Sequence, residues 1–187
     1  DYSKADAIIV NTCAFIESAR KEAIETILEM AEYKKNNCKR LIVTGCLSEK
    51  YRPQLIAELP EVDDFLGINE YEKIYAAIIG DENAVCPVSE HKRVLTTPAH
   101  YAYLKISDGC NNHCTFCTIP SIRGAYKSRT IESLTAELSD LVSRGVKEVI
   151  LVAQDVTNYG KDLYGKPSLV ELLRELEKQT SNTYVLC

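Results

Sequence analysis

The sequence predicts an α/β fold made of two parallel sheets that are joined by a linker. Short apolar runs typical of strands alternate with longer amphipathic segments over residues 7–79, and the alternation returns from residue 101 onward. Between them, residues 80–99 contain Gly, Asn, Ser and Pro and show no alternation, as connecting segments do. The chain of 187 residues is long enough for two modest domains.

The first half predicts three strands, each followed by a helix. The expected strands are residues 7–10, 40–44 and 64–66, and the expected helices are residues 17–34, 49–59 and 71–79. The first helix has an apolar stripe at helical spacing, formed by Ala23, Ile24, Ile27, Leu28 and Ala31. Three strands make a small sheet, so we expect the native polypeptide to have a further unit before Asp1.

The second half predicts a β-α-β-α-β order, which opens either a barrel or a doubly wound sheet. The expected elements are strands at 101–107, 149–153 and 183–186, a long loop at 108–129, and helices at 131–144 and after residue 168. Gly145 is placed to end the first of these helices. Ser168 and Glu171 have the spacing of a capping box at the start of the second.

The composition is that of a globular protein without a membrane segment. Apolar residues make up 45% of the chain, and no apolar run approaches the ~20 residues that span a bilayer. The net charge of -5 disfavours a general nucleic-acid binder. The eight cysteines are unevenly clustered in a chain that can bury a real core, which favours reduced thiols in a cytoplasmic, metal-binding protein over a disulfide scaffold.

Cys110, Cys114 and Cys117 form the pattern C-x3-C-x2-C directly after a predicted strand. Three thiolates at this spacing can hold an iron–sulfur cluster and leave one iron open to a small molecule. Active groups of α/β proteins gather at the carboxyl ends of parallel strands, and Gln154 and Asp155 follow the next strand of this half. We therefore expect the three cysteines to mark the site of chemistry.

A structural zinc site is the alternative for these cysteines, with His113 or Cys86 as the fourth ligand. Structural zinc usually takes two separated pairs of ligands, and His113 lies between two of the cysteines, where reaching the same metal is awkward. Phe116 could shield a cluster next to Cys117 or anchor the core, and both interpretations stay open.

Cys13 and Cys46 each follow a predicted strand of the first half. The ends of neighbouring parallel strands share one edge of a sheet, so the two thiols could share a metal or a cluster. Two buried core cysteines are the alternative interpretation. Cys38 lies among Asn and Lys and is expected to be a surface thiol.

The three-cysteine pattern resembles the cluster loop of radical S-adenosylmethionine (SAM) enzymes. Together with the segments Asn-Thr-Cys13 and Thr-Gly-Cys46, it resembles the radical SAM methylthiotransferase family. The resemblance implies a flavodoxin-like parallel-sheet domain at residues 1–80 that lacks its first unit, a linker at 81–99, and the first half of a radical SAM partial (β/α) barrel at 100–187.

The resemblance also implies two 4Fe–4S clusters and SAM as cofactors. The cluster on the three-cysteine pattern would bind SAM, and cleavage of SAM would yield a radical able to attack an unactivated C–H bond. The second cluster would use Cys13, Cys46 and a third cysteine upstream of Asp1.

The resemblance to radical SAM enzymes also makes three residues candidates for contacts with SAM, namely Phe116, Arg123 and Gln154. An arginine can pair with a carboxylate of SAM or of the substrate, and a surface salt bridge is the alternative for Arg123. A polar cap at the end of a strand is the alternative for Gln154.

Longer strings distinguish the branches of this family. Residues 11–19, 117–124 and 153–165 resemble the branch that adds a methylthio group to the β-carbon of an aspartate in small-subunit ribosomal protein S-twelve. The MiaB-type branch modifies tRNA and tends to read Gln-Asn-Val-Asn where this chain has Gln154-Asp-Val-Thr. A tRNA methylthiotransferase is therefore one alternative, and a noncatalytic zinc-binding module is another.

The resemblance implies two partners, the ribosomal protein as substrate and a reductant such as flavodoxin. Direct binding of nucleic acid by this chain is not expected. The later barrel strands of the family and its C-terminal TRAM domain have no counterpart in the sequence, so we expect this chain to be inactive alone.

Overall fold

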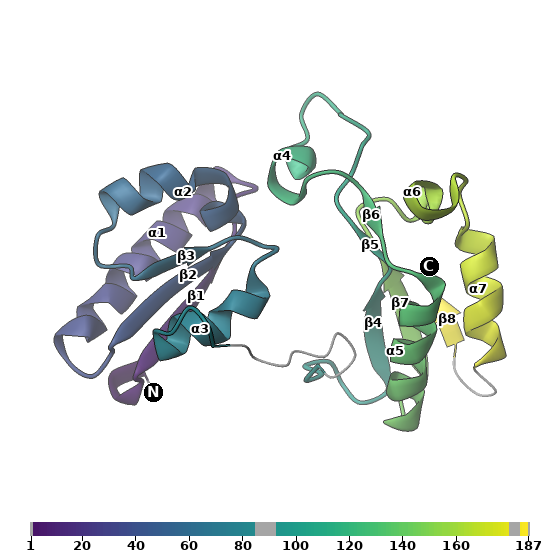
Figure 1. The fold of residues 1–187 in the computed structure, drawn as a ribbon, viewed down its shortest axis with the longest axis horizontal. Coiled ribbons are helices and arrows are strands. Elements are labelled where there is room, and N and C mark those ends of the chain that lie inside the picture. Colours follow the sequence, from purple (N-terminus) through teal and green to yellow (C-terminus); the bar gives the residue numbers. More distant parts are fainter. Residues whose placement is uncertain (1, 85–92, 180–183, 187) are drawn as a thin grey trace. The chain divides into compact units, whose positions relative to one another are not determined.

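The computed structural model describes residues 2–84, 93–179 and 184–186. The chain divides into two compact units, Asp1–Val88 and Ser89–Cys187, and each is described by itself (Figure 1). Helices and parallel strands alternate in both units, so the predicted α/β class is confirmed. No helix in the described segments is long and apolar enough to cross a membrane.

The first unit is built on a parallel sheet with the strand order β1-β2-β3. Its strands are β1 (Ala7–Thr12), β2 (Arg40–Gly45) and β3 (Asp64–Leu66). Its helices are α1 (Glu17–Ala31), α2 (Cys46–Glu58) and α3 (Ile74–Ile79), with short 3-10 helices η1 (Tyr2–Lys4), η2 (Glu32–Lys35) and η3 (Tyr71–Lys73). The predicted strands and helices are all present, and only their ends differ from the prediction.

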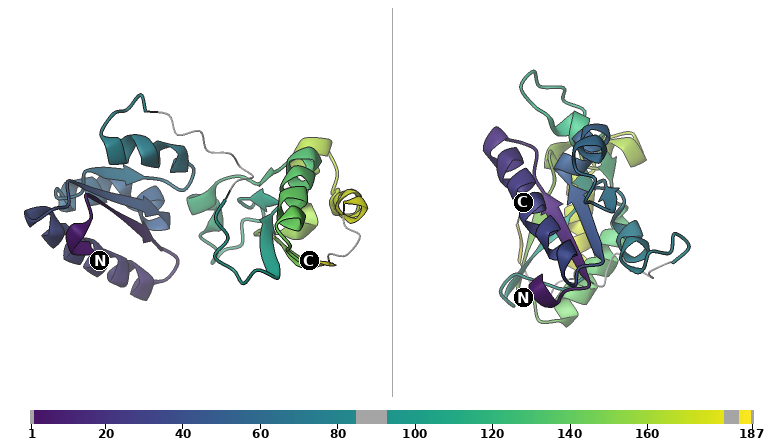
Figure 2. Two further views of the ribbon diagram at one scale, coloured as in Figure 1. Left: turned by 90° about the horizontal axis from the view of Figure 1, so that it is seen from below. Right: turned by 90° about the vertical axis from the view of Figure 1, so that its left-hand side faces the viewer.

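Helices cover both faces of this sheet. α1 and α2 line a common groove on one face, and α3 lies on the opposite face from α1 (Figure 2, left). The middle strand β2 is therefore enclosed on both sides, and Leu41, Ile42 and Val43 are fully buried. Ile42 packs with Leu66 and Ala77 in the core beneath α3.

The apolar stripe of α1 is only partly buried, contrary to the prediction. Ala23 and Ile27 are buried together with Met30, whereas Ile24 and Leu28 are 37% and 47% exposed. The buried positions follow i, i+4, i+7 spacing and form the face that the sheet covers. Ile24 instead borders the groove between α1 and α2.

α2 begins directly at Cys46, three residues earlier than predicted. The tight connection depends on Gly45, which has a φ of 101°. A Cβ atom at Gly45 would lie 2.4 Å from the carbonyl oxygen of Thr12, so a side chain would force β1 and β2 apart. The helix is kinked at Tyr51, which has non-helical φ and ψ and lies two residues before Pro53.

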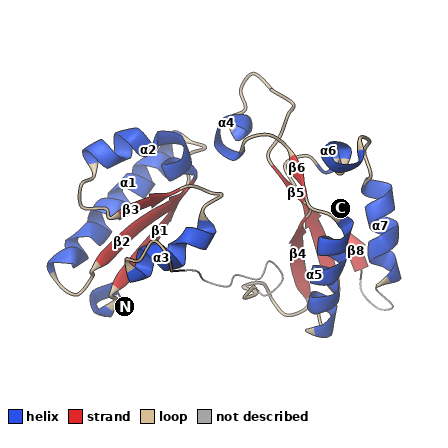
Figure 3. Cartoon of the chain, viewed as in Figure 1, coloured by secondary structure: helices blue, strands red, loops and turns tan. Residues whose placement is uncertain are grey.

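The second unit contains a parallel sheet with the strand order β4-β7-β8 and an antiparallel two-stranded ribbon, β5-β6 (Figure 3). Its strands are β4 (Tyr101–Lys105), β5 (Ser107–Asp108), β6 (Lys127–Ser128), β7 (Glu148–Val152) and β8 (Tyr184–Leu186). Its helices are α4 (Ile119–Arg123), α5 (Ile131–Ser143), α6 (Lys161–Tyr164) and α7 (Leu169–Lys178), with a 3-10 helix η4 (Val156–Asn158). The predicted long loop thus contains a ribbon and a helix of its own.

One apolar core holds α5 and α7 against the parallel sheet. Its fully buried members include Leu104, Val149, Leu138 and Leu172. These residues come from β4, β7, α5 and α7. Other buried members of the core lie along each of these elements at the spacing of a strand or a helix. The core therefore fixes β4 and β7 side by side, and their carboxyl ends meet at one edge of the sheet.

A side chain caps the start of α5, whereas no side chain caps the start of α7. Thr130 caps α5 by accepting a hydrogen bond from the Ser133 backbone N–H, and Gly145 follows the end of this helix as predicted. The predicted capping box at α7 is wrong. Ser168 is buried and donates to the Lys166 carbonyl oxygen, while Glu171 pairs with Lys166.

Candidate functional site

The three-cysteine loop, residues 109–118, lies beyond β4 and the short strand β5 (Figure 1). Its first cysteine is fixed by the backbone, because the Cys110 N–H donates to the Gly124 carbonyl oxygen at 3.2 Å. Gly109 has a φ of +75°, and a Cβ atom there would lie 2.2 Å from the Ala125 carbonyl oxygen. The start of the loop is thus packed tightly against residues 124–125.

The other two cysteines lie on a more open part of the loop. The Cys117 N–H donates to the Cys114 carbonyl oxygen at 3.0 Å, which closes a tight turn between them. Cys114 is exposed, Cys110 and Cys117 are half-buried, and residues 111–116 are all exposed. His113 has a positive φ of 48°, which is uncommon for a residue with a side chain.

Two asparagines between Cys110 and Cys114 connect the loop to neighbouring elements. Asn111 Oδ1 accepts the backbone N–H of Tyr126 at 2.9 Å, next to β6. Asn112 Nδ2 donates to Asp155 Oδ2 at 2.9 Å, just beyond β7. The expectation that the ends of two strands bring polar groups to one place is therefore confirmed for Asp155.

Asp155 is the most strongly hydrogen-bonded carboxylate of this edge. Hydrogen bonds from Thr157 and Asn112 lower the pKa of Asp155 to about 2, although partial burial opposes the shift. Asn158 Nδ2 also donates to its Oδ2. Asp155 therefore stays ionised over the physiological pH range.

Tyr126 joins the ribbon to the same edge. Its phenol accepts from the Ser107 hydroxyl at 2.8 Å and donates to the Asp155 carbonyl oxygen at 2.8 Å. Burial raises the pKa of Tyr126, so the phenol remains a donor. A polar pocket of about 310 Å³ lies here, and it is lined by Asn111, Asn112, Tyr126, Asn158, Lys161 and Asp162.

The structure gives the three residues that were predicted to contact SAM different surroundings. Arg123 Nη1 pairs with both carboxylate oxygens of Asp108, at 3.1 and 3.2 Å, which is the salt bridge kept as the alternative. Phe116 is 88% exposed, so its alternative role as a core anchor is wrong. Gln154 is exposed at the turn after β7, beside Asp155.

Asp108 is held between two cations at the start of the loop. Burial opposes ionisation, but Lys105 and Arg123 outweigh it and lower the pKa of the Asp108 carboxyl. Nothing in the sequence indicated the roles of Asp108 and Asn112, whereas Tyr126 was expected near the loop as a candidate substrate contact. Asn112 and its partner Asp155 are 43 residues apart in the sequence, and Asp108 and Arg123 are 15 residues apart. No local sequence pattern could reveal these contacts.

The three thiols suit an iron–sulfur cluster by the chemistry of their donor set. Soft thiolate ligands select Zn, Cu(I) or Fe–S clusters, and three donors on one accessible loop leave a coordination site free. Across residues 2–84, 93–179 and 184–186, no three His, Cys, Asp or Glu side chains converge closely enough to hold a metal ion. The sulfur atoms of the loop are therefore not gathered into a ligand set here, and Cys86 lies outside the described residues.

Cys13 and Cys46 follow paired residues of the first sheet, because Thr12 lies opposite Gly45 in the register of β1 and β2. Cys13 is exposed and Cys46 is buried. The hydroxyls of Thr44 and Ser48, two residues on either side of Cys46, are buried and have no hydrogen-bond partner within the described segments. Such orphaned groups fit an edge that receives a polar ligand.

Cys38 does not have the surface position expected of it. It is 4% exposed, and its thiol donates to the Arg40 carbonyl oxygen at 3.2 Å. Its neighbours in the sequence are polar, but the chain turns here into β2 and carries the side chain inward.

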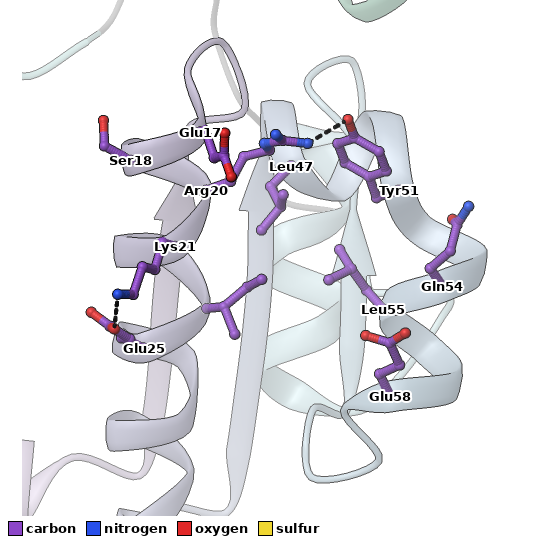
Figure 4. Close-up of a pocket in the computed structure, with 11 residues that line it drawn as sticks. Glu17, Ser18, Arg20, Lys21, Glu25, Leu47, Tyr51, Gln54, Leu55 and Glu58 are labelled. Carbon is purple, nitrogen blue, oxygen red and sulfur yellow. Dashed lines mark hydrogen bonds and ion pairs between the residues drawn. The ribbon is translucent and has the colours of Figure 1, made fainter.

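A second cavity lies in the first unit, and its lining includes Leu47, the residue after Cys46. It is a groove of about 620 Å³ between α1 and α2 (Figure 4). Leu47, Leu55 and Ile24 line its apolar part, and Arg20 reaches across to donate to the Tyr51 phenol at 3.0 Å. Ile24 is therefore exposed because its side chain borders this groove and not the sheet.

Comparison with known proteins matches each unit to a family. Residues 1–67 match the model described as "Uncharacterized protein family UPF0004", and residues 104–186 match that of the radical SAM superfamily. The chain is 53% identical over 188 residues to a protein named ribosomal protein uS12 methylthiotransferase RimO from Clostridium tetani. Relatives of the same name from Clostridium novyi and Acetivibrio thermocellus are 52% and 51% identical.

These matches cover 94–95% of this chain but only 42–43% of the relatives' length. Solved structures of the radical SAM methyltransferase TsrM, with a SAM analog, and of the cobalamin-dependent enzyme OxsB match with TM-scores of 0.58 and 0.53. The match to TsrM covers 92% of this chain and 40% of the TsrM chain. The match to OxsB covers 95% of this chain and 29% of the OxsB chain. At 15% and 14% identity, they support the fold alone.

The fold and the cysteine loop of the second unit are those of a radical SAM protein. With the UPF0004 match before it and relatives at about half identity, the chain is similar to radical SAM methylthiotransferases over 94–95% of its length.

Proposed function

We propose that this chain supplies the cofactor-binding segments of a methylthiotransferase that modifies an aspartate of ribosomal protein uS12. The observation that supports the proposal is the three-cysteine loop beside the end of β7, in a chain that is 53% identical to a relative of that name. A noncatalytic zinc module is less consistent with a radical SAM match over residues 104–186.

In this proposal Cys110, Cys114 and Cys117 hold a 4Fe–4S cluster. When bound, the cluster and SAM supply the radical chemistry that an unactivated C–H bond requires. The loop residues present the thiolates at an accessible edge, and the tight packing of Gly109 fixes where the loop starts.

The residues around the loop orient SAM. Gln154 offers an amide at the end of β7, and Phe116 offers an exposed ring that can cover a base. Arg123 uses one nitrogen for Asp108, and the rest of its five N–H donors stay available for a carboxylate.

Cys13 and Cys46 contribute to a second 4Fe–4S cluster in the first unit. They lie at the same edge of the sheet, beside the orphaned hydroxyls of Thr44 and Ser48. Two thiols fall short of the three that such a site needs, so a further ligand has to join them.

Anaerobic reconstitution with iron and sulfide tests the cofactor. We expect a brown chain that dithionite bleaches, and Cys114→Ala should lose iron bound at the loop because one of three ligands is gone. Cys38→Ala is the matched control, since Cys38 is a buried thiol with a backbone partner, and it should bind iron like the parent. A colourless chain that carries one zinc ion would contradict the proposal.

The substrate can be tested in a chimera in which this chain replaces the matching segment of the Clostridium tetani relative. Mass spectrometry of a uS12 peptide should show addition of a methylthio group, and nucleoside analysis of tRNA should show no modification. The reverse result would favour the MiaB-type alternative. This chain without the remainder should not turn over the peptide.

The proposal also implies partners and a location. The electron that reduces the cluster has to come from a reductant, and we propose a flavodoxin. A ribosomal protein substrate implies that the enzyme acts in the cytoplasm. Purified flavodoxin should reduce the reconstituted chimera, as followed by bleaching of its visible spectrum.

A further inference from the structure

The spacer between Cys110 and Cys114 is attached to the end of β7 through one carboxylate. Asn112 Nδ2 donates to Asp155 Oδ2 at 2.9 Å, across 43 residues of sequence. Asn111, the residue before it, is attached to the ribbon through the Tyr126 N–H. Both residues that follow Cys110 are therefore tied to other elements, although they are exposed.

The Asp155 carboxylate is itself held rigidly. Its Oδ1 accepts the Thr157 backbone N–H at 3.0 Å and the Thr157 hydroxyl at 2.6 Å, and its Oδ2 accepts Asn158 Nδ2 at 2.5 Å. Its backbone carbonyl accepts the Tyr126 phenol. A carboxylate fixed in this way is a preorganised acceptor, and an acceptor that carries charge makes a stronger hydrogen bond than a neutral one.

We propose that Asp155 is a positioning residue that holds the three-cysteine loop at the end of β7 through Asn112. The inference rests on the proposed function and deepens it, because the loop is the proposed cluster site. Outer residues that orient ligands are commonly as necessary for metal affinity as their partners. Asp155 would act through Asn112 and not by touching SAM or the cluster.

The first test measures iron affinity of the reconstituted chain by competition with a chelator, and the EPR spectrum after reduction. Asp155→Ala and Asn112→Ala should each weaken iron binding about tenfold. The double variant should be no worse than either single variant, because both remove the same contact. Asp140→Ala is the matched control, since this carboxylate lies on α5 and pairs with Arg144. Its iron affinity and spectrum should match those of the parent.

An exchange of the two side chains provides the rescue. In Asn112→Asp with Asp155→Asn, the amide nitrogen at 155 can donate to the carboxylate at 112 and to Asn158, whose side-chain amide turns over to present its oxygen. The amide oxygen at 155 still accepts from Thr157. Each single exchange should weaken iron binding, and the pair should recover most of the affinity and the parent's EPR spectrum. If Asp155→Ala is impaired but Asn112→Ala is not, or if the exchange fails to rescue, Asp155 has another role and the proposal is wrong.

A second measurement needs no cluster. In the metal-free chain, Asp155→Ala and Asn112→Ala should each raise the alkylation rate of Cys110 severalfold, as followed by mass spectrometry, while Asp140→Ala should not. Unchanged rates would overturn the proposal. A parent chain that takes up no iron would instead count against the proposed cofactor, so the two failures are distinguishable.

Discussion

Single carboxylates fix the turns that follow the strands in both units. In the first unit Glu70 accepts the Gly67 backbone N–H at 2.8 Å and pairs with Lys73 and Arg52. Burial opposes ionisation of Glu70, but these partners outweigh it and lower its pKa to about 2. The charge of Glu70 is therefore a stabilising feature of the turn after β3.

The low pKa predicts a pH dependence of stability. Because the folded pKa of Glu70 is below its ordinary value of 4.5, its contribution is complete above that pH and is lost as the pH falls toward 2. We expect the free energy of unfolding of the parent to fall by on the order of 2 kcal/mol more than that of Glu70→Gln between pH 6 and pH 2.5. Denaturant titrations followed by circular dichroism would measure both.

Glu72→Gln is the control, because Glu72 is an exposed residue of η3, the short helix that directly follows Glu70. It should keep the steep pH dependence of the parent. Equal slopes for the parent and Glu70→Gln would contradict the prediction.

Residue patterns pointed to candidate side chains, but they did not reveal the surroundings of those side chains. The three-cysteine spacing was informative because all three proposed ligands fall within one short segment, where a local pattern can show them. The environments of Cys38, Phe116 and Arg123 depend on how the chain packs, and for Cys38 the polar neighbours in the sequence were misleading. Asp108, the partner of Arg123, is 15 residues away in the sequence.

At the scale of elements, one buried carboxylate attaches α5 to its surroundings. Glu137 is 3% exposed, and its two oxygens accept from Arg93 Nε at 3.0 Å and from Arg129 Nη1 at 2.6 Å. Arg129 follows the ribbon β5-β6, and Arg93 precedes β4. The helix, the ribbon and the entry to the sheet therefore meet at Glu137.

Removal of this carboxylate should destabilise the second unit strongly. Glu137→Ala removes the carboxylate partner of Arg93 and Arg129. Because both guanidinium groups keep other hydrogen bonds and Arg93 is 39% exposed, we expect a cost at or below the lower end of the about 3–5 kcal/mol of a fully buried pair. Glu132→Ala, an exposed glutamate of the same helix, should change the free energy of unfolding by less than about 0.5 kcal/mol. Urea unfolding of both variants would decide, and equal small changes would show that the charge network is dispensable.

Long periodic elements and the short apolar strands β3 and β8 were predictable, and the shortest elements around the cysteine loop were not. α5 and α7 carry apolar residues at helical spacing, and β4 and β7 are apolar runs, so their existence followed from the sequence. β5 and β6 have only two residues each, and α4 and α6 have five and four. Elements this short depend on tertiary contacts such as those of Tyr126. The periodicity of apolar residues in the sequence does not show such contacts.

At the scale of the molecule, composition and motif order predicted the class and the family. The α/β alternation and the radical SAM match agree with that prediction. The hydrogen-bonded surroundings of the loop and the groove between α1 and α2 were not predictable, because they arise where separate elements meet.

The net charge of -5 leads to a prediction for the whole chain. Nonspecific binding to nucleic acid requires many basic contacts, and its affinity falls steeply with salt. We expect bulk tRNA to show no retention by this chain in filter binding at 150 mM salt, roughly the physiological ionic strength. Retention that weakens with rising salt would contradict this prediction and would favour the tRNA-modifying alternative.

The close approach of Gly109 to Ala125 also restricts how this gene can change. Every glycine codon begins with two guanines, so any mutation in either of those bases puts a side chain, or a stop, at this position. The carbonyl oxygen 2.2 Å from the virtual Cβ leaves no room for even a methyl group. Third-base changes alone would be silent, and a mutational library of this chain should therefore retain only synonymous codons at residue 109 when selected for an intact loop.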